Sequence, residues 1–304
     1  MQDNHQLSPD QTDFQTRKKI HQAVLKNSRW LGDGPPIMDE KFNAAQTDER
    51  RELFVEILRR AARQESNVGL SRAYTALADK LEFCGDEECG SSACPTCRRA
   101  YQRASSAAQT GIIHQVSKLL HGKELVFVTI IPVDYCFPCG TLHQFDVRQF
   151  NCSVITNLTE AKIIRPLIGG VDFSLERTAT GLKYWQPHWH FGTWTNNRPL
   201  LRKRLKSVFP ASERYEHPVH IKKPYDLNFL LYANKGFKII HLLRNGRRQL
   251  PEFLLAMDRI DPLDLMVFHR FAMRQHSQGF KFETKGDWYF KFQHHAQGFK
   301  FQQN

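Results

Sequence analysis

The sequence has no long hydrophobic run, and this absence excludes one broad class of protein. Its longest apolar stretches, such as residues 125–133, are far shorter than the roughly 20 residues that a helix needs to cross a bilayer. Residues 1–20 also lack an apolar segment followed by a small-residue cleavage site, which is the pattern of a secretory signal. We therefore expect a cytoplasmic protein with no membrane role.

Acidic residues are too few to balance the basic ones. There are 43 Lys and Arg against 31 Asp and Glu, which gives a net charge of +12 and a pI near 9.4. Such an excess attracts polyanions, and nucleic acid is the obvious candidate. The alternative is that the basic composition only aids solubility, and the charge alone does not separate the two.

The seven cysteines cannot all pair, and an odd count in a reducing compartment argues against a disulfide framework. Four of them form a C-x4-C-x4-C-x2-C pattern: Cys84, Cys89, Cys94 and Cys97. Four thiolates within 14 residues can surround a tetrahedral Zn²⁺, so the pattern predicts a structural zinc knuckle. A second pair, Cys136 and Cys139, leaves open a site shared with Cys94 and Cys97. Cys152 stands alone and is expected to be a buried apolar residue.

Hydrophobic periodicity predicts an α+β fold with a central antiparallel sheet. Apolar residues at helical spacing predict helices over residues 49–64, 69–81, 95–120, 145–162, 198–208 and 225–236. Alternating or β-branched runs predict strands at 125–131, 170–177, 187–194 and 218–222. The order suggests a flexible lead-in (1–48), a helical region with the zinc knuckle (49–122), a catalytic core (123–240) and an extension (241–304).

The carboxy-terminal extension combines two patterns. Residues 250–257 and 262–271 are predicted to be apolar helices, after which the pentapeptide QGFKF occurs twice, at residues 278–282 and 297–301. Alternating Phe and Lys could let bases stack on rings while ammonium groups meet phosphates. An amphipathic strand that packs its phenylalanines on a core explains the repeat equally well.

The segment Pro187-His188-Trp189-His190 carries the clearest chemical signal. On a strand, His188 and His190 project from one face while Trp189 enters the core on the other. If the preceding loop covers residues 178–186, Glu176 lies opposite His188 and supplies a third ligand. Two imidazoles and a carboxylate with open positions suit Mg²⁺ or Mn²⁺ bound together with a phosphate oxygen.

A candidate nucleophile follows the sheet. Tyr232 can attack phosphorus, and Lys235, one helical turn later, can neutralise phosphate charge or lower the pKa of the phenol. Tyr225, two turns earlier, is the reserve nucleophile. Basic side chains that could contact DNA lie at the start of the helix after the cysteines and on the helix over 198–208: Arg98, Arg99, Arg202, Lys203 and Arg204.

In this order, the motifs resemble those of the HUH endonucleases, and among them the rolling-circle replication initiators of small bacterial plasmids. The resemblance covers residues 84–235 and rests on the Cys-Pro-x-Cys element with its basic helix, the strand at residues 127–129, the His-Trp-His strand preceded by Glu176, and the Tyr-x-x-Lys pair. It implies that Tyr232 nicks single-stranded or extruded origin DNA, leaving a 5′-phosphotyrosine and a 3′-hydroxyl for the polymerase. A host helicase, a host polymerase and the bacterial cytoplasm are implied with it.

Two features depart from this family pattern. Asn228 stands where related initiators often have a glutamate that activates water for termination, and no motif explains the extension after residue 236. A rolling-circle transposase or relaxase would share the chemistry, but one dominant tyrosine and no helicase motif favour an initiator. The other alternative is a non-catalytic zinc-containing DNA-binding protein, which predicts DNA retention without nicking.

Overall fold

A computed structural model describes most of the chain after residue 43. The described residues are 44–84, 89–120, 122–163, 166–224, 229–235, 242–243, 246–269, 271–276, 279–284, 289–295 and 298–303. The described residues divide into two compact units, one covering residues 44–269 and the other the strands after residue 270.

A six-stranded sheet organises the larger unit. Its strands follow the order β5-β1-β4-β3-β6, with the short β2 also pairing with β4, and all of these pairs are antiparallel. The strands are β1 Glu124–Ile130, β2 Phe137–Pro138, β3 Leu167–Arg177, β4 Lys183–Thr195, β5 Val219–Lys222 and β6 Met266–His269. The predicted α+β class with a central antiparallel sheet is therefore confirmed.

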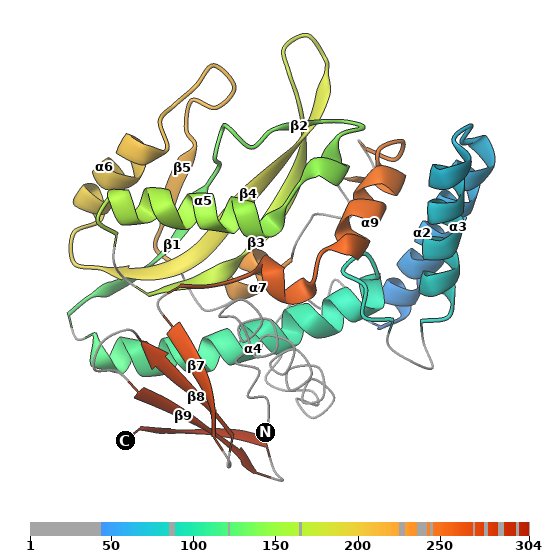
Figure 1. Ribbon diagram of the computed structural model, residues 1–304. Coiled ribbons are helices and arrows are strands. Elements are labelled where there is room, and N and C mark those ends of the chain that lie inside the picture. Colours follow the sequence, from blue (N-terminus) through green and yellow to red (C-terminus); the bar gives the residue numbers. More distant parts are fainter. Residues whose placement is uncertain are drawn as a thin grey trace, which may run out of the picture. The chain divides into compact units, whose positions relative to one another are not determined.

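One face of the sheet is apolar and covered by helices (Figure 1). Trp189 and Phe191 of β4 are each 1% exposed. The Nε1 of Trp189 donates to Oδ1 of Asn151, a residue of α5, at 2.8 Å. Phe253 of α9 stacks on Trp185 with ring centroids 4.8 Å apart. The helices and 3-10 turns of this part are α5 Val147–Glu160, α6 Arg198–Val208, α9 Leu250–Arg259, η1 Leu142–Gln144 and η2 Pro262–Leu265.

The opposite face carries the long helix α4 Pro95–Leu119 and the short helix α7 Phe229–Ala233. Gln109 of α4 donates through Nε2 to the Gly169 carbonyl at 2.9 Å. Trp194 of β4 donates through Nε1 to Ser117 Oγ at 3.0 Å. Helix α4 is thus bonded directly to the two central strands, and α7 lies between α4 and the sheet (Figure 1).

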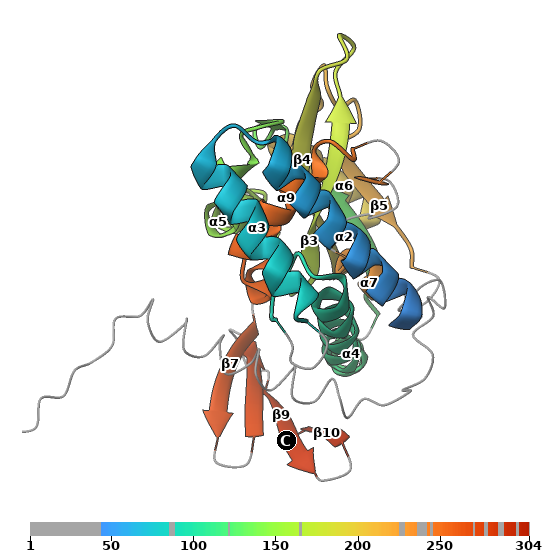
Figure 2. The same cartoon turned by 90° about the vertical axis from the view of Figure 1, so that its right-hand side faces the viewer.

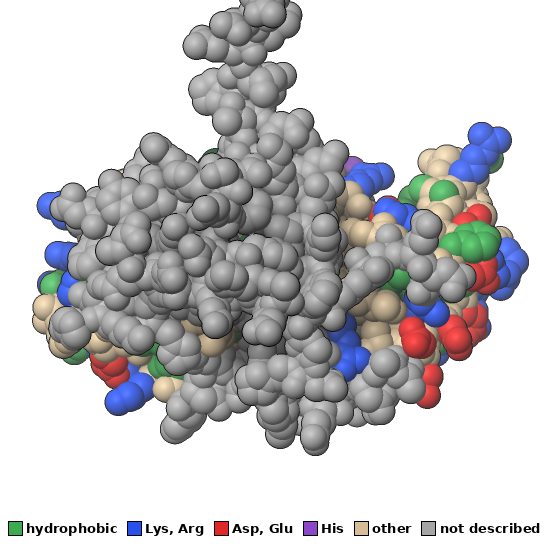
Figure 3. Space-filling model, turned by 90° about the horizontal axis from the view of Figure 1, so that it is seen from below, with side chains coloured by type: hydrophobic (Ala, Val, Ile, Leu, Met, Phe, Trp, Pro, Cys, Tyr) green, Lys and Arg blue, Asp and Glu red, His purple; other side chains and the backbone are tan. Residues whose placement is uncertain are grey.

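Two further helices, α2 Ala44–Gln64 and α3 Val68–Glu82, lie side by side as a hairpin (Figures 1 and 2). Asn67 caps α3 because its Oδ1 accepts from the Leu70 amide at 3.0 Å. Arg59 pairs with Glu82, and Arg60 pairs with Glu56. Charges of both signs are therefore mixed on this hairpin (Figure 3). Among the described residues no helix combines the length and apolarity that crossing a membrane requires.

The predicted helix over residues 262–271 is wrong. Only residues 262–265 form a 3-10 turn, and residues 266–269 form β6, which pairs with β3 at Ile168↔Phe268. This run of four residues is too short for periodicity to separate strand from helix, and the open edge of β3 decides the outcome. Part of the predicted extension thereby belongs to the main sheet.

The second unit contains a four-stranded antiparallel sheet in the order β10-β9-β8-β7. Its strands are β7 Phe271–His276, β8 Gly279–Thr284, β9 Tyr289–His295 and β10 Gly298–Gln303. The register pairs Phe282 with Phe290, Phe292 with Phe301 and Lys281 with Lys291. The GFKF segments of the two repeats thus lie in β8 and β10, the strands on either side of β9.

Candidate metal centre and nucleophile

The candidate site contains two histidines of β4. His188 and His190 are two residues apart, so both lie on the face that carries α4 and α7, while Trp189 points into the core on the other side. Their ring centroids are 5.9 Å apart. The predicted pair of imidazoles on one sheet face is therefore present.

The third member of the group is Asp172, and the predicted position of Glu176 is wrong. The register pairs Asp172 with His188, whereas Glu176 pairs with Tyr184. The sequence suggested a loop over residues 178–186, but β4 already begins at Lys183. A tight turn makes this possible, with the Thr178 amide donating to the Leu182 carbonyl at 2.9 Å and Gly181 at a φ of +84°.

Asp172, His188 and His190 offer ligand atoms that all lie within 4.8 Å of one another. His190 Nε2 is 3.3 Å from Asp172 Oδ2, and Asp172 Oδ1 is buried without a hydrogen-bond partner among the described residues. A buried carboxylate oxygen without a partner is costly unless something else satisfies it. Two imidazoles and a carboxylate are a donor set that divalent cations accept, so these residues fit a metal ion.

Each imidazole has a hydroxyl group within hydrogen-bonding distance of one ring nitrogen. Thr129 Oγ1 of β1 lies 2.8 Å from His190 Nδ1, and Ser174 Oγ lies 3.1 Å from His188 Nε2. A partner on Nδ1 fixes the ring orientation and leaves Nε2 of His190 directed at Asp172. Thr129 was not predicted as a site residue, because only the pairing of β1 with β4 brings it opposite His190.

The ionisation states suit cation binding. Burial alone would raise the pKa of the Asp172 carboxyl, but Lys235 and the two imidazoles outweigh burial and hold that pKa well below its usual range. Burial lowers the pKa of His188 to about 3. At neutral pH the group therefore contains an ionised carboxylate and a neutral His188 imidazole, the forms that bind a metal.

The candidate nucleophile lies against this group. Tyr232 of α7 is 40% exposed, and its ring centroid is 4.9 Å from that of His190. Lys235 Nζ lies 3.2 Å from the Tyr232 ring centroid and 2.6 Å from Asp172 Oδ2. A phenol, an ammonium group and the carboxylate are thus within reach of one another.

Lys235 does not share a helix face with Tyr232 as predicted. Helix α7 covers residues 229–233, and Lys235 follows its end, with its amide donating to the Tyr232 carbonyl at 3.4 Å. The chain bends back so that the ammonium group covers the tyrosine ring. The reserve nucleophile Tyr225 and the residue Asn228 lie outside the described residues.

Two glycines allow α7 to lie this close to the sheet. A Cβ at Gly170 of β3 would stand 2.6 Å from the Ala233 carbonyl oxygen, and one at Gly192 of β4 would stand 3.0 Å from the Phe229 ring. Any side chain at Gly170 would push the end of α7 away from the sheet. Glycine in a strand often marks such a close approach, so the two glycines could have indicated from the sequence that another segment packs on this face.

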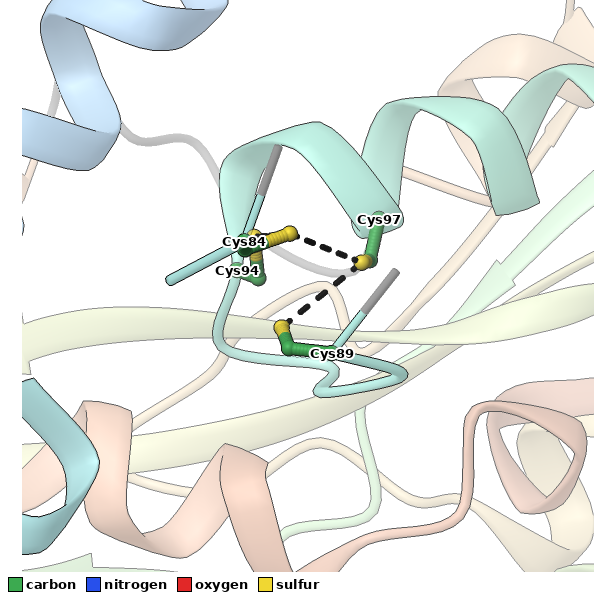
Figure 4. Close-up of side chains that lie close together, drawn as sticks. All are labelled: Cys84, Cys89, Cys94 and Cys97. Carbon is green, nitrogen blue, oxygen red and sulfur yellow. Dashed lines mark hydrogen bonds between the residues drawn. The ribbon is translucent and has the colours of Figure 1, made fainter. Parts of the chain in front are cut away.

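The four clustered cysteines converge beside the first turn of α4 (Figure 4). Cys84 Sγ is 3.5 Å from both Cys94 Sγ and Cys97 Sγ, and Cys89 Sγ is 3.7 Å from Cys97 Sγ. Thiolates around a tetrahedral ion at roughly 2.3 Å stand about 3.8 Å apart. Hydrogen bonds from Cys94 and Cys97 lower the pKa of the Cys89 thiol, and the same contacts with Cys89 raise the pKa of the Cys94 and Cys97 thiols. The cluster can therefore hold a structural metal such as zinc.

The remaining cysteines lie apart from this cluster. All seven are free thiols, and Cys136 and Cys139 do not belong to a group of metal-type ligands among the described residues. The local four are thus the group that the fold assembles, in preference to a site shared with Cys136 and Cys139. Cys152 is exposed on α5, so the expectation that it is buried is wrong.

The predicted DNA-contacting residues separate into two groups. Arg202, Lys203 and Arg204 are exposed on α6. Arg98, in contrast, is 5% exposed and donates to the main-chain carbonyls of Asn234 and Lys235, so its interpretation as a DNA contact is wrong. Arg99 is partly buried, and its Nη1 lies 3.5 Å from Thr47 Oγ1. A basic residue at the start of a helix was not distinguishable from a surface cation by sequence.

Comparison with known proteins identifies no relative of this chain. No protein-family model, curated protein or solved structure matches the chain.

Proposed function

We propose that the chain is a metal-dependent DNA-nicking enzyme of the HUH type that initiates rolling-circle replication. One observation carries the proposal: the Tyr232 ring lies 4.9 Å from the His190 ring, beside a group of ligand-type atoms from Asp172, His188 and His190. A nucleophile and a set of cation ligands need this proximity to act on one phosphate. The net charge of +12 suits a polyanionic substrate.

In the proposed reaction, Tyr232 Oη attacks the scissile phosphorus and the bond from phosphorus to the 3′-oxygen breaks. The phenol proton passes to solvent, the leaving 3′-oxygen takes up a proton, and no electrons are exchanged with another reagent. The products are a 5′-phosphotyrosine and a free 3′-hydroxyl. Host helicase and polymerase would then open and extend the origin from that hydroxyl.

Other side chains of the site would bind the metal, orient its ligands and offset negative charge. Asp172, His188 and His190 would hold Mg²⁺ or Mn²⁺, which supplies Lewis-acid polarisation of a phosphate oxygen when bound. Thr129 keeps the His190 ring in its orientation. The Lys235 ammonium, 3.2 Å from the Tyr232 ring centroid, can offset the negative charge that develops on the phenolate and the phosphate.

Two further roles complete the proposal. The cluster of Cys84, Cys89, Cys94 and Cys97 would hold Zn²⁺ in a closed structural site, since it offers four thiol ligands and is mostly buried. Single-stranded or extruded origin DNA would run over α6, where the exposed Arg202, Lys203 and Arg204 can meet phosphates.

The test is a search for a covalent protein-DNA adduct that survives denaturation. Purified protein is incubated with Mn²⁺ and labelled single-stranded oligonucleotides that tile the DNA molecule carrying its gene. Tyr232→Phe and His190→Ala are examined beside Tyr215→Phe, which removes a hydroxyl that contacts Tyr184 instead of the site. We expect an adduct in the wild type and in Tyr215→Phe only.

The outcomes separate the two leading hypotheses. An adduct that requires Mn²⁺, Tyr232 and His190 supports nicking. DNA retention without an adduct in any divalent metal would overturn the catalytic proposal and favour a non-catalytic zinc-containing DNA-binding protein. An adduct that persists in Tyr232→Phe would move the nucleophile elsewhere, with Tyr225 the next residue to replace.

A further inference from the structure

Arg98 links the cluster of four cysteines to the segment that carries the nucleophile. It directly follows Cys97 in the first turn of α4, and its guanidinium is buried. Nε donates to the Lys235 carbonyl and Nη2 to the Asn234 carbonyl, each at 3.3 Å. The planar guanidinium therefore donates to two successive carbonyls just after α7. The single ammonium group of a lysine could not reproduce this fixed geometry.

The same helix holds Asn234 from its side chain as well. Asn234 is 4% exposed, and its Nδ2 donates to Gln109 Oε1 at 2.7 Å and to the Leu230 carbonyl at 2.8 Å. Gln109 in turn donates through Nε2 to the Gly169 carbonyl of β3. Helix α4 thus fixes residues 234 and 235 against the sheet at two points, more than two turns apart.

The position of Arg98 depends on the four-cysteine cluster. Cys94 is the N-cap of α4, and its carbonyl accepts from the Arg98 amide at 2.8 Å. Cys94 and Cys97 belong to the helix start, whereas Cys84 and Cys89 approach from the preceding segment (Figure 4). A metal held by all four thiolates would lock the first turn of α4 in the orientation that directs Arg98 toward residues 234 and 235.

We infer that Arg98 is a positioning residue that transmits the occupancy of the four-cysteine cluster to the Tyr232–Lys235 segment. This inference rests on the proposed nicking function for its catalytic consequence. With the cluster loaded, Arg98 holds the carbonyls of residues 234 and 235 and thereby the Lys235 ammonium between Asp172 and the Tyr232 ring. With the cluster empty, the first turn of α4 loosens and Lys235 and Tyr232 lose their mutual placement, while α6 remains free to bind DNA.

Hydrogen exchange measured over residues 229–235 tests the coupling without reference to activity. The proteins compared are the wild type, Cys89→Ser, Arg98→Met and the double variant, with zinc content and circular dichroism as checks on the fold. Arg60→Met is the control, since that arginine pairs with Glu56 within α2. We expect faster exchange in each single variant and no further increase in the double variant, because both changes break one path.

The catalytic consequence is measured separately, as the single-turnover rate of adduct formation at saturating DNA and the Kd for DNA. We expect Arg98→Met to keep its zinc and its DNA affinity while the rate falls about 100-fold, and Arg98→Lys to recover part of the rate. Additive exchange effects, or unchanged exchange in Cys89→Ser after loss of zinc, would overturn the inference. If the wild type forms no adduct at all, the proposed function fails, and the exchange data still decide the coupling.

Discussion

The molecule contains two groups of metal-type ligands, and they are assembled in opposite ways. The four-cysteine cluster comes from 14 consecutive residues, and three of its thiols are at most 6% exposed. The Asp172, His188 and His190 group is built across two paired strands, with Tyr232 and Lys235 brought to it from a later segment. The first group provides four protein ligands, whereas the second provides three and lies beside the Tyr232 ring, which is 40% exposed. This contrast is the one expected between a structural metal site and a catalytic one.

The largest effect is expected at the four-cysteine cluster. Cys97→Ser should abolish zinc binding and lower the free energy of unfolding by several kcal/mol, because structural zinc contributes its binding energy to folding. Cys139→Ser, which changes a thiol outside the cluster, should keep its zinc. Metal content and chemical denaturation of both variants give the comparison, and a zinc-replete Cys97→Ser protein of unchanged stability would show that the cluster is not a metal site.

The second effect concerns the identity of the carboxylate ligand. Asp172→Asn should weaken Mn²⁺ binding by about 100-fold or more, since it removes an anionic ligand from the group, and the zinc content should remain unchanged. Glu176→Gln is the matched control, because Glu176 pairs with Tyr184 instead of His188. Calorimetric titration with Mn²⁺ distinguishes the two. Weaker binding in Glu176→Gln than in Asp172→Asn would contradict the ligand set given by the strand register.

The third effect is a pH dependence of stability that originates in His188 of the second group. Burial lowers the pKa of His188 to about 3, below the roughly 6.5 of an unfolded histidine. Between these values the unfolded chain binds the proton and the folded chain does not, so stability falls as the pH drops below about 6.5 and is unaffected above it. At pH 5 the loss amounts to about 2 kcal/mol. Urea denaturation of wild type and His188→Gln at pH 7 and pH 5 measures it, and equal pH dependence in both would refute this origin.

The smallest effect is expected at Thr129, which forms a hydrogen bond to one of the ligands. Thr129→Val removes the hydroxyl that lies 2.8 Å from His190 Nδ1 and keeps the side-chain volume. Loss of such a partner typically lowers metal affinity by about 10-fold to 100-fold, and we expect the lower end of this range. Titration of Mn²⁺ into Thr129→Val, with Thr193→Val on β4 as a control outside the group, tests this. An unchanged affinity would mean that the sheet alone orients His190.

Features that depend on local spacing could be predicted from the sequence, whereas features assembled from distant segments could not. Helices α2 to α6 and the strands that flank His188 were located from periodicity, and the cysteine spacing identified a group that the fold does bring together. Glu176 was predicted in the place that Asp172 occupies, because an error of four residues in the turn changes the partner of every residue along β3. The helix predicted over residues 262–271 failed because strand pairing with β3 outweighed a weak local preference.

The sequence by itself determined the α+β class, the four-cysteine cluster and the placement of His188 and His190 on one face, because each depends on spacing within a single element or a short segment. Tertiary structure decided that Asp172 completes the group, that Lys235 bridges Asp172 and Tyr232, and that Arg98 is buried against residues 234 and 235. Arg98 and Lys235, for example, are 137 positions apart in the chain. Strand register and helix packing fix such contacts, and no local pattern encodes them.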